Sequence, residues 1–210
     1  MNEKFYKLPA EKQRRILNAG YRVFSRNNYR KSPMSEIAGE AGISKSLLFH
    51  YFYNKKELYL FLWEEAARIS VRHLAEYGCY VPGDLFEMME RGMRAKLELI
   101  REYPDMSFFV IKAYYEREPE ISEEIQKSYR NFVSFRAEGI LKELDPAGFI
   151  PGIDLGMMYK EMLLASEGYV WKLIQRGEPL DVDELERGFS ELMAFWKQIY
   201  RRPVREEDSK

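Results

Sequence analysis

The 210-residue chain has one cysteine, two histidines and no long apolar run. A lone cysteine, Cys79, excludes an intrachain disulfide and a cysteine-based metal site, and we expect it to be a small buried apolar group. No stretch approaches the ~18 apolar residues that suggest a membrane span, and the N-terminus lacks the apolar core of a signal peptide. We therefore expect a cytoplasmic protein with no membrane partner.

The sequence also lacks the motifs of common active sites. His50 and His73 are far apart, and neither has an acidic partner at the i−3 spacing of helical di-iron sites. There is neither a glycine-rich phosphate loop nor a nucleophile elbow. We therefore expect no catalytic residue, no metal and no cofactor, and hence not an enzyme.

Charge is balanced overall but unevenly distributed along the chain. The formal net charge is −1, yet residues 1–60 contain 12 Lys and Arg against 5 Asp and Glu, and the rest contains 21 against 29. The N-terminal part is therefore net +7 and the remainder net −8. A basic end on an acidic body is typical of a DNA-binding protein, because the body's charge discourages binding in the wrong orientation.

The pattern of apolar residues predicts an all-α protein, since it shows helical spacing and no clear strand alternation. Asn27 and Asn28 tolerate left-handed backbone geometry and are expected to end the first long helix. We expect about nine helices, at residues 9–27, 33–41, 45–52, 55–77, 84–103, 105–117, 119–144, 155–176 and 181–201.

The segment from Ser32 to Leu58 has the pattern of a helix-turn-helix followed by the start of another helix. Ser32 is a candidate N-cap with Pro33 at the first helical position, and Gly42 allows a tight turn. Ser44 is a second N-cap candidate, and Asn54 is a third, with Glu57 completing a capping-box-like pattern.

The second helix of this motif has distinct inner and outer sides. Leu48 and Phe52, four residues apart, are expected to point into the core. The remaining side chains mix polar tips, rings and an aliphatic group, which suits the base edges and phosphates of the DNA major groove. These outward residues are Lys45, Ser46, Leu47, Phe49, His50 and Tyr51.

Residues Arg14 to Leu58 resemble the DNA-binding domain of TetR-type (TetR/AcrR) transcriptional regulators. The resemblance is specific because many anchor residues follow in order without a gap. They are Ile16, Leu17, Ala19, Phe24, Tyr29, Met34, Ile37, Ala38, Ala41, Gly42, Ser44, Lys45, Leu48, Tyr51, Phe52, Asn54, Lys55 and Leu58. The resemblance implies a three-helix DNA-binding domain at 1–53, a larger helical domain for ligand binding and dimerisation at 54–202, and a polar tail at 203–210.

The resemblance also implies roles for individual residues. Lys45 and Ser46 would reach base edges, and Leu47 would face the groove near a thymine methyl. Ser32, His50, Tyr51 and Lys55 match phosphate-contact positions. The chain departs from the pattern at Ser46, where glycine is very common, and at Phe49, where tyrosine is usual, so Phe49 keeps the ring but loses a hydroxyl that would bond a phosphate.

Two further surfaces are expected in the larger domain. The last two helices, 155–176 and 181–201, carry a broad apolar band, and we expect a homodimer in which they form a four-helix bundle with a second copy. Clustered aromatic and methionine residues could simply form the core, or they could line a pocket for a small apolar or aromatic effector. The pocket candidates are Trp63, Phe86, Met89, Met93, Phe108, Phe109, Tyr114, Phe132, Phe135 and Trp171.

These features together predict a ligand-responsive repressor that binds a palindromic double-stranded DNA operator as a homodimer. The helix at 55–77, which joins the two predicted domains, would be the lever between effector and DNA. The alternative is a ligand-independent architectural or division-related DNA-binding protein of the same fold. The sequence leaves open the effector, the operator, the regulated genes and the sign of regulation.

Overall fold

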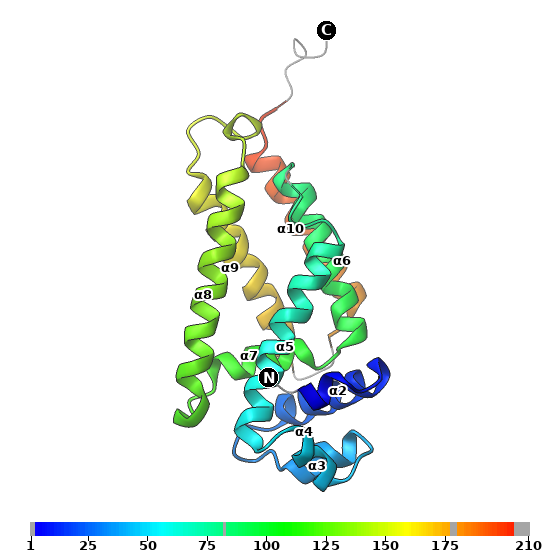
Figure 1. The fold of residues 1–210 in the computed structure, drawn as a ribbon. Helices are drawn as coiled ribbons and strands as arrows, with labels where there is room; N and C mark the ends of the chain where they lie inside the picture. The colour runs from blue at the N-terminus through cyan, green and yellow to red at the C-terminus, as the bar shows by residue number, and fades with distance from the viewer. Residues whose placement is uncertain (1–2, 82, 177–179, 204–210) are drawn as a thin grey trace. The chain divides into compact units, whose positions relative to one another are not determined.

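The computed structural model describes residues 3–81, 83–176 and 180–203, apart from the side chains of residues 131–138, 140, 141, 143 and 174. This part of the chain is built from helices, and its one β-bridge, between Phe149 and Arg201, is isolated (Figure 1). The helices are α1 (Glu3–Tyr6), α2 (Ala10–Arg26), α3 (Met34–Glu40), α4 (Lys45–Tyr51), α5 (Lys55–Glu76), α6 (Leu85–Glu102), α7 (Met106–Tyr115), α8 (Pro119–Glu143), the 3-10 turn η1 (Pro146–Gly148), α9 (Leu155–Ile174) and α10 (Val182–Tyr200).

The all-α prediction is confirmed, and the nine expected helices all occur close to their expected bounds. The described residues contain one more, the four-residue α1, which the sequence analysis missed. Its Phe5 is fully buried and packs against the rings of Phe52 and Phe61. A four-residue helix has no repeating apolar pattern, so its position depends on this one aromatic anchor.

One detail of the helix ends was predicted wrongly. Asn27 follows α2 in an extended conformation, with φ of −115°, and no non-glycine residue among those described has a positive φ. The side chain of Asn27 instead donates from Nδ2 to the carbonyl of Val23, 3.3 Å away. Its backbone N–H donates to the same carbonyl at 3.1 Å, so Asn27 ends the helix in an extended conformation with both donors on Val23, and not by left-handed geometry.

The chain divides into two compact units. The first comprises Met1–Arg72 and Leu99–Val133, and the second comprises His73–Glu98 and Ser134–Lys210. These packing units are not divided at residue 53, because α5, α7 and the N-terminal part of α8 pack with the preceding helices. The functional division into 1–53, 54–202 and 203–210 stays a prediction, and residues 204–210 of its tail lie outside the described residues.

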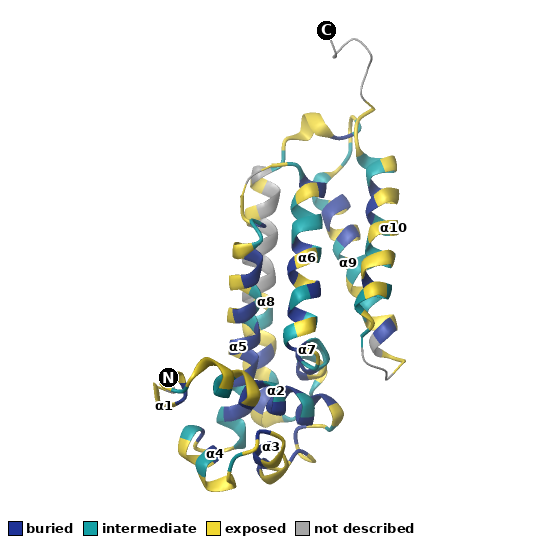
Figure 2. Cartoon of the chain, turned by 90° about the vertical axis from the view of Figure 1, so that its right-hand side faces the viewer, coloured by how far each residue is buried: buried dark blue, intermediate teal, exposed yellow. Residues whose placement is uncertain are grey.

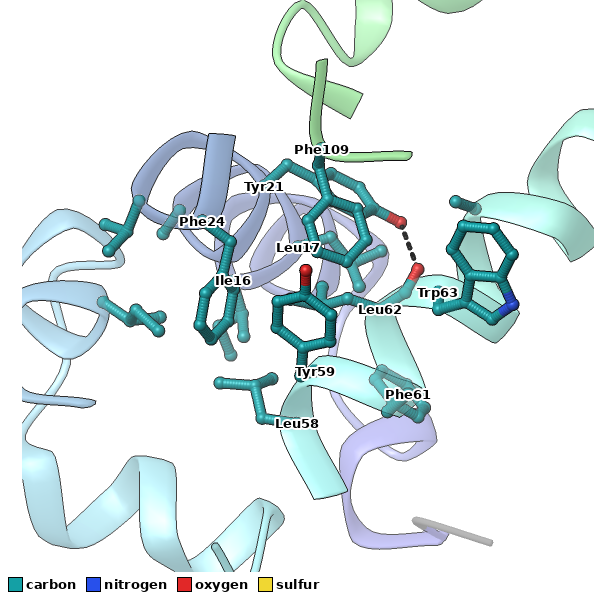
Figure 3. Packing of buried hydrophobic residues seen from close by; sticks show 14 of the residues in the cluster. Ile16, Leu17, Tyr21, Phe24, Leu58, Tyr59, Phe61, Leu62, Trp63 and Phe109 are labelled. Atoms are coloured by element: carbon teal, nitrogen blue, oxygen red, sulfur yellow. Dashed lines mark hydrogen bonds between the residues drawn. The ribbon is translucent and has the colours of Figure 1, made fainter. Parts of the chain in front are cut away.

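The first unit has an aromatic core in which α2, α5 and α7 meet (Figure 3). The ring of Tyr59 packs edge-on against Phe24 and Phe109. The buried hydroxyl of Tyr21 donates to the carbonyl of Leu62 across 3.2 Å, so the one polar atom of that ring has a partner. Buried residues of α3 and α4 belong to the same core, which fixes these two helices to α5.

The second unit is formed by the N-terminal part of α6 with α9 and α10. Its core contains Phe86, Met162 and Trp196, each almost completely buried. The segment after α10 is held to η1 by Arg202, whose backbone N–H donates to the carbonyl of Gly148 at 3.1 Å. None of the described helices is both long and apolar enough to cross a membrane.

Candidate nucleic-acid interface

The turn between α3 and α4 is set by local backbone chemistry. Gly42 adopts a positive φ of 63°, which costs glycine little. The backbone N–H of Ile43 donates to the carbonyl of Ala38 at 3.0 Å, and that of Gly42 donates to Gly39 at 3.0 Å, as in a Schellman motif. Two helices joined by so tight a turn form a helix-turn-helix.

Helix α4 begins at the predicted cap and exposes the predicted face. The hydroxyl of Ser44 accepts a hydrogen bond from the backbone N–H of Leu47 at 3.1 Å. Leu48 and Phe52 are fully buried. The outer side of the helix is exposed at Lys45, Ser46, Phe49 and His50 and half-buried at Leu47 and Tyr51 (Figure 2).

The structure differs from the expectation at Ser32. Pro33, not Ser32, is the N-cap of α3, and no side chain caps that helix. Ser32 is 0% exposed, and its hydroxyl donates to the carbonyl of Asn28 at 2.9 Å. The side chain of Asn28 in turn accepts from the backbone N–H of Lys31, so the loop before α3 is closed by its own side chains. A phosphate contact by Ser32 would first require its hydroxyl to leave this bond.

Helix α5 begins next to the outer side of α4 with both predicted capping partners in place. Asn54 accepts from the backbone N–H of Glu57 at 2.8 Å, and Glu57 accepts from the backbone N–H of Tyr53 at 2.8 Å. Lys55, in the first turn, donates from Nζ to the carbonyl of Arg30 at 3.3 Å. The same Nζ lies 4.6 Å from the ring centre of Tyr29. Lys55 is therefore held against the loop that precedes α3.

That loop carries a cation that the sequence analysis did not assign. Arg30 pairs with Glu118, at the start of α8, through Nε at 2.5 Å and Nη2 at 3.0 Å. The backbone N–H of Tyr29 donates to Glu116 at 3.0 Å. These partners are more than 80 residues apart in sequence, and no local pattern could have indicated them. Tyr53, also unassigned, is the most exposed large apolar side chain described.

The residues predicted to line a pocket are distributed over both units. Trp63, Phe108, Phe109 and Tyr114 belong to the first unit, and Phe86, Met89, Met93 and Trp171 belong to the second. Phe109 and Phe86 are almost fully buried, and each belongs to the core of its own unit. The indole of Trp63 donates to the hydroxyl of Ser128 at 3.1 Å. The side chains of Phe132 and Phe135 lie outside the described residues, and the pocket stays a prediction.

Helix α9 exposes an apolar stripe on its outer side. Met157, Leu164 and Trp171 are spaced seven residues apart and are 60%, 59% and 40% exposed, whereas Met158 and Met162 of the same helix are buried in the core. Phe195 of α10 is exposed as well. The sequence analysis predicted a broad apolar band here without identifying Met157 or Leu164. These side chains form a row of large apolar groups along one exposed face of α9.

Comparison with known proteins supports this interpretation of the N-terminal motif. Residues 16–61 match the model of bacterial regulatory proteins of the tetR family. The HTH-type transcriptional regulator RutR of Escherichia coli (strain K12) is 30% identical over 97 residues, which are 46% of this chain and 44% of RutR. The chain thus aligns with less than half the length of this relative.

Solved structures extend the likeness of the fold to nearly the whole chain. A TetR family transcriptional regulator from Chloroflexus aurantiacus has 20% identity and a TM-score of 0.62, covering 96% of this chain and 98% of that one. The fatty acid degradation regulator FadR from Bacillus halodurans has 16% identity and a TM-score of 0.63, covering 89% and 96%. At these identities the comparison shows a shared fold.

Proposed function

Because the chain belongs to the tetR family of bacterial regulatory proteins, we propose that it is a transcription regulator that binds double-stranded DNA through α3 and α4. One observation carries this proposal. Helix α4 buries Leu48 and Phe52 while its opposite side exposes Lys45, Ser46 and His50. A short, rigidly capped helix with a polar outer side can enter the major groove, where its side chains meet base edges.

The residues of α4 and α5 have different roles in this proposal. Lys45 and Ser46, in the first turn of α4, contact base edges, and Leu47 contacts a thymine methyl. His50, Tyr51 and Lys55 contact phosphates, and the positive end of the α5 helix dipole favours the same anion as Lys55. Phe49 packs beside them, with the ammonium of Lys45 5.9 Å from its ring centre.

We further propose that the protein acts as a homodimer through α9 and α10. The stripe of Met157, Leu164 and Trp171 supports this arrangement, because a heptad spacing keeps three large side chains on one seam. Two copies related by a two-fold axis would present two reading helices, so the operator should be a palindrome with paired half-sites.

The regulatory part of the proposal is a repressor released by a small apolar or aromatic effector. The effector must prefer one of two conformations of the dimer, or it cannot change the affinity for DNA. The burial of Phe86 and Phe109 in packed cores instead favours the second candidate, a ligand-independent architectural or division-related DNA-binding protein. Release of bound DNA by an apolar compound would decide for the first candidate.

The testing experiment is selection of bound sequences from a random pool of DNA duplexes, using the purified full chain at moderate salt. An enriched palindrome is the expected result, and its half-site spacing would report the separation of the two reading helices. A Lys45→Ala protein, selected in parallel, should enrich a degenerate site. Salt-sensitive binding without enrichment would favour the architectural candidate, and no binding at low salt would refute both candidates.

A further inference from the structure

The loop before α3 carries an arginine, Arg30, whose guanidinium already forms an ion pair within the protein. The guanidinium of Arg30 meets both carboxylate oxygens of Glu118, at 2.5 and 3.0 Å, with two parallel N–H donors. The arginine side chain is nevertheless 77% exposed, whereas that of Glu118 is 15% exposed. One partner is therefore fixed by the fold, and the other is a long side chain free to rotate into solvent.

Arg30 also adjoins a residue that the proposed function places against DNA. Its carbonyl accepts the hydrogen bond from Lys55, whose ammonium lies over the ring of the preceding residue, Tyr29. An arginine fork binds a phosphate with the same two-donor geometry that it uses for a carboxylate. A phosphate bound at Lys55 would thus have a second cation beside it, provided that the guanidinium leaves Glu118.

Further acidic groups from the α7–α8 junction and the first turn of α8 act on this cation. The hydrogen bond to Glu118, with smaller contributions from the charges of Glu116 and Glu120, raises the pKa of the Arg30 guanidinium. Glu116 also accepts from the backbone N–H of Tyr29. The hydrogen bond from Arg30 holds the pKa of Glu118 below its ordinary value, so the carboxylate is charged throughout the neutral range. The carboxylate of Glu118 and a DNA phosphate therefore compete for the guanidinium of Arg30 at every pH near neutrality.

We propose that the guanidinium of Arg30 pairs with Glu118 in the free protein and with a DNA phosphate in the complex. Binding of DNA then replaces the carboxylate with a phosphate. This inference rests on the proposed function and adds a contact residue and an intramolecular competitor to it. Because phosphate contacts are independent of sequence, Glu118 sets the general affinity for duplex DNA and leaves base preference unchanged.

The proposed exchange predicts that substitutions of Glu118 and of Arg30 change the affinity for DNA in opposite directions. Glu118→Gln removes the carboxylate that pairs with the Arg30 guanidinium and should tighten binding by about two- to fivefold, the range of an exposed ion pair. Arg30→Ala should weaken binding and lower the slope of log K against log salt by about one per protomer. In the Arg30→Ala background, Glu118→Gln should give no further gain, because there is no guanidinium left to release.

The experiment measures binding of the full-length variants to a random-sequence DNA duplex over a series of salt concentrations. Glu90→Gln is the matched control: Glu90 pairs with Lys197 in the second unit, so the variant makes the same change in net charge away from the reading motif. Circular dichroism confirms that each variant is folded. Arg30 is exposed, so Arg30→Ala tests the inference even if Glu118→Gln fails to fold.

Each outcome decides one question. A gain for Glu118→Gln that Glu90→Gln lacks and that Arg30→Ala abolishes supports the exchange. Equal gains for the two glutamine variants would overturn it, because the effect would then be one of net charge. A gain that persists without Arg30 would exclude this arginine as the released cation. If the unmodified protein fails to bind at low salt, the proposed function itself fails.

Discussion

Gly20, within α2, permits a close approach of α2 to α5. A Cβ atom at this position would lie 2.6 Å from Cδ1 and 3.2 Å from Cδ2 of Leu62. Leu62 is fully buried, and its carbonyl accepts the hydrogen bond from Tyr21, so it has little room to move (Figure 3). We expect Gly20→Ala to push α5 away from α2 and to lower the free energy of unfolding.

The size of the change in the free energy of unfolding follows from opposing effects. Alanine is favoured over glycine inside a helix by about 1 kcal/mol. An extra methyl group in a filled core costs about 1–3 kcal/mol, and a weakened hydrogen bond from Tyr21 would add about 0.5–1.5 kcal/mol. The net expectation for Gly20→Ala is a loss of about 0.5–3.5 kcal/mol in the free energy of unfolding.

Gly39 of α3 provides the matched control, because a Cβ atom there would meet nothing within 4 Å. Gly39→Ala should gain stability from helix propensity alone, so the difference between the two variants isolates the packing cost against Leu62. Urea unfolding followed by circular dichroism measures both, with equal m values required for a valid comparison. Equal shifts in the same direction for the two variants would refute the close approach inferred from Gly20.

The remaining predictions concern DNA, assembly and pH. Lys45→Ala should lose discrimination between operator and random DNA, whereas Lys55→Ala should weaken binding to both and flatten the salt slope; equal losses on both DNAs for both variants would contradict these roles. Leu164→Glu should give a folded monomer in analytical ultracentrifugation, whereas Val71→Glu, at an exposed site in the first unit, should remain dimeric. Burial and a hydrogen bond to a glutamate raise the pKa of Tyr6 to about 12. An unfolded phenol ionises near its ordinary pKa of 10, so this stabilisation is complete below that value and declines as pH rises towards about 12. Tyr6→Phe should therefore make the loss of stability at alkaline pH shallower. An unchanged profile of unfolding midpoint against pH would show that the raised pKa of Tyr6 does not cause this loss.

The helix ends that were predicted correctly depend on groups close together in sequence. Ser44 and Asn54 each accept from a backbone N–H three residues later, as their types and positions indicated. Asp154 and Asp181 cap α9 and α10 in the same way. Ser32 has an equally suitable side chain, yet it bonds backwards to the carbonyl of Asn28. A serine hydroxyl can accept from a later backbone N–H or donate to an earlier carbonyl. The choice depends on the conformation of the surrounding loop, which sequence spacing alone does not determine.

The exposed side of α4 was predictable for the same local reason, but the intramolecular partners of the neighbouring cation Arg30 were not. The burial of Leu48 fixes which side of α4 faces outward, and helical spacing indicates that side directly. The pairing of Arg30 with Glu118 depends instead on how the chain returns to the first unit from Leu99 onward and places the α7–α8 junction. Among many exposed cations and glutamates, composition cannot indicate which ones meet.

Contacts between residues distant in sequence also bear on how binding of an effector would be transmitted to α3 and α4. The sequence analysis assigned that role to α5 alone, yet α2 is also bonded to the segment between α6 and α7. Asn18 donates to the carbonyl of Glu102 at 3.2 Å, and Arg22 joins Asp105 to Glu40 of α3, with both separations 3.2 Å. Any displacement of residues 102–105 must either move α2 and α3 with it or break these bonds. Since a ligand can shift DNA affinity only through contacts that differ between two states, this segment would be a second route of coupling beside α5 if the protein responds to a ligand as proposed.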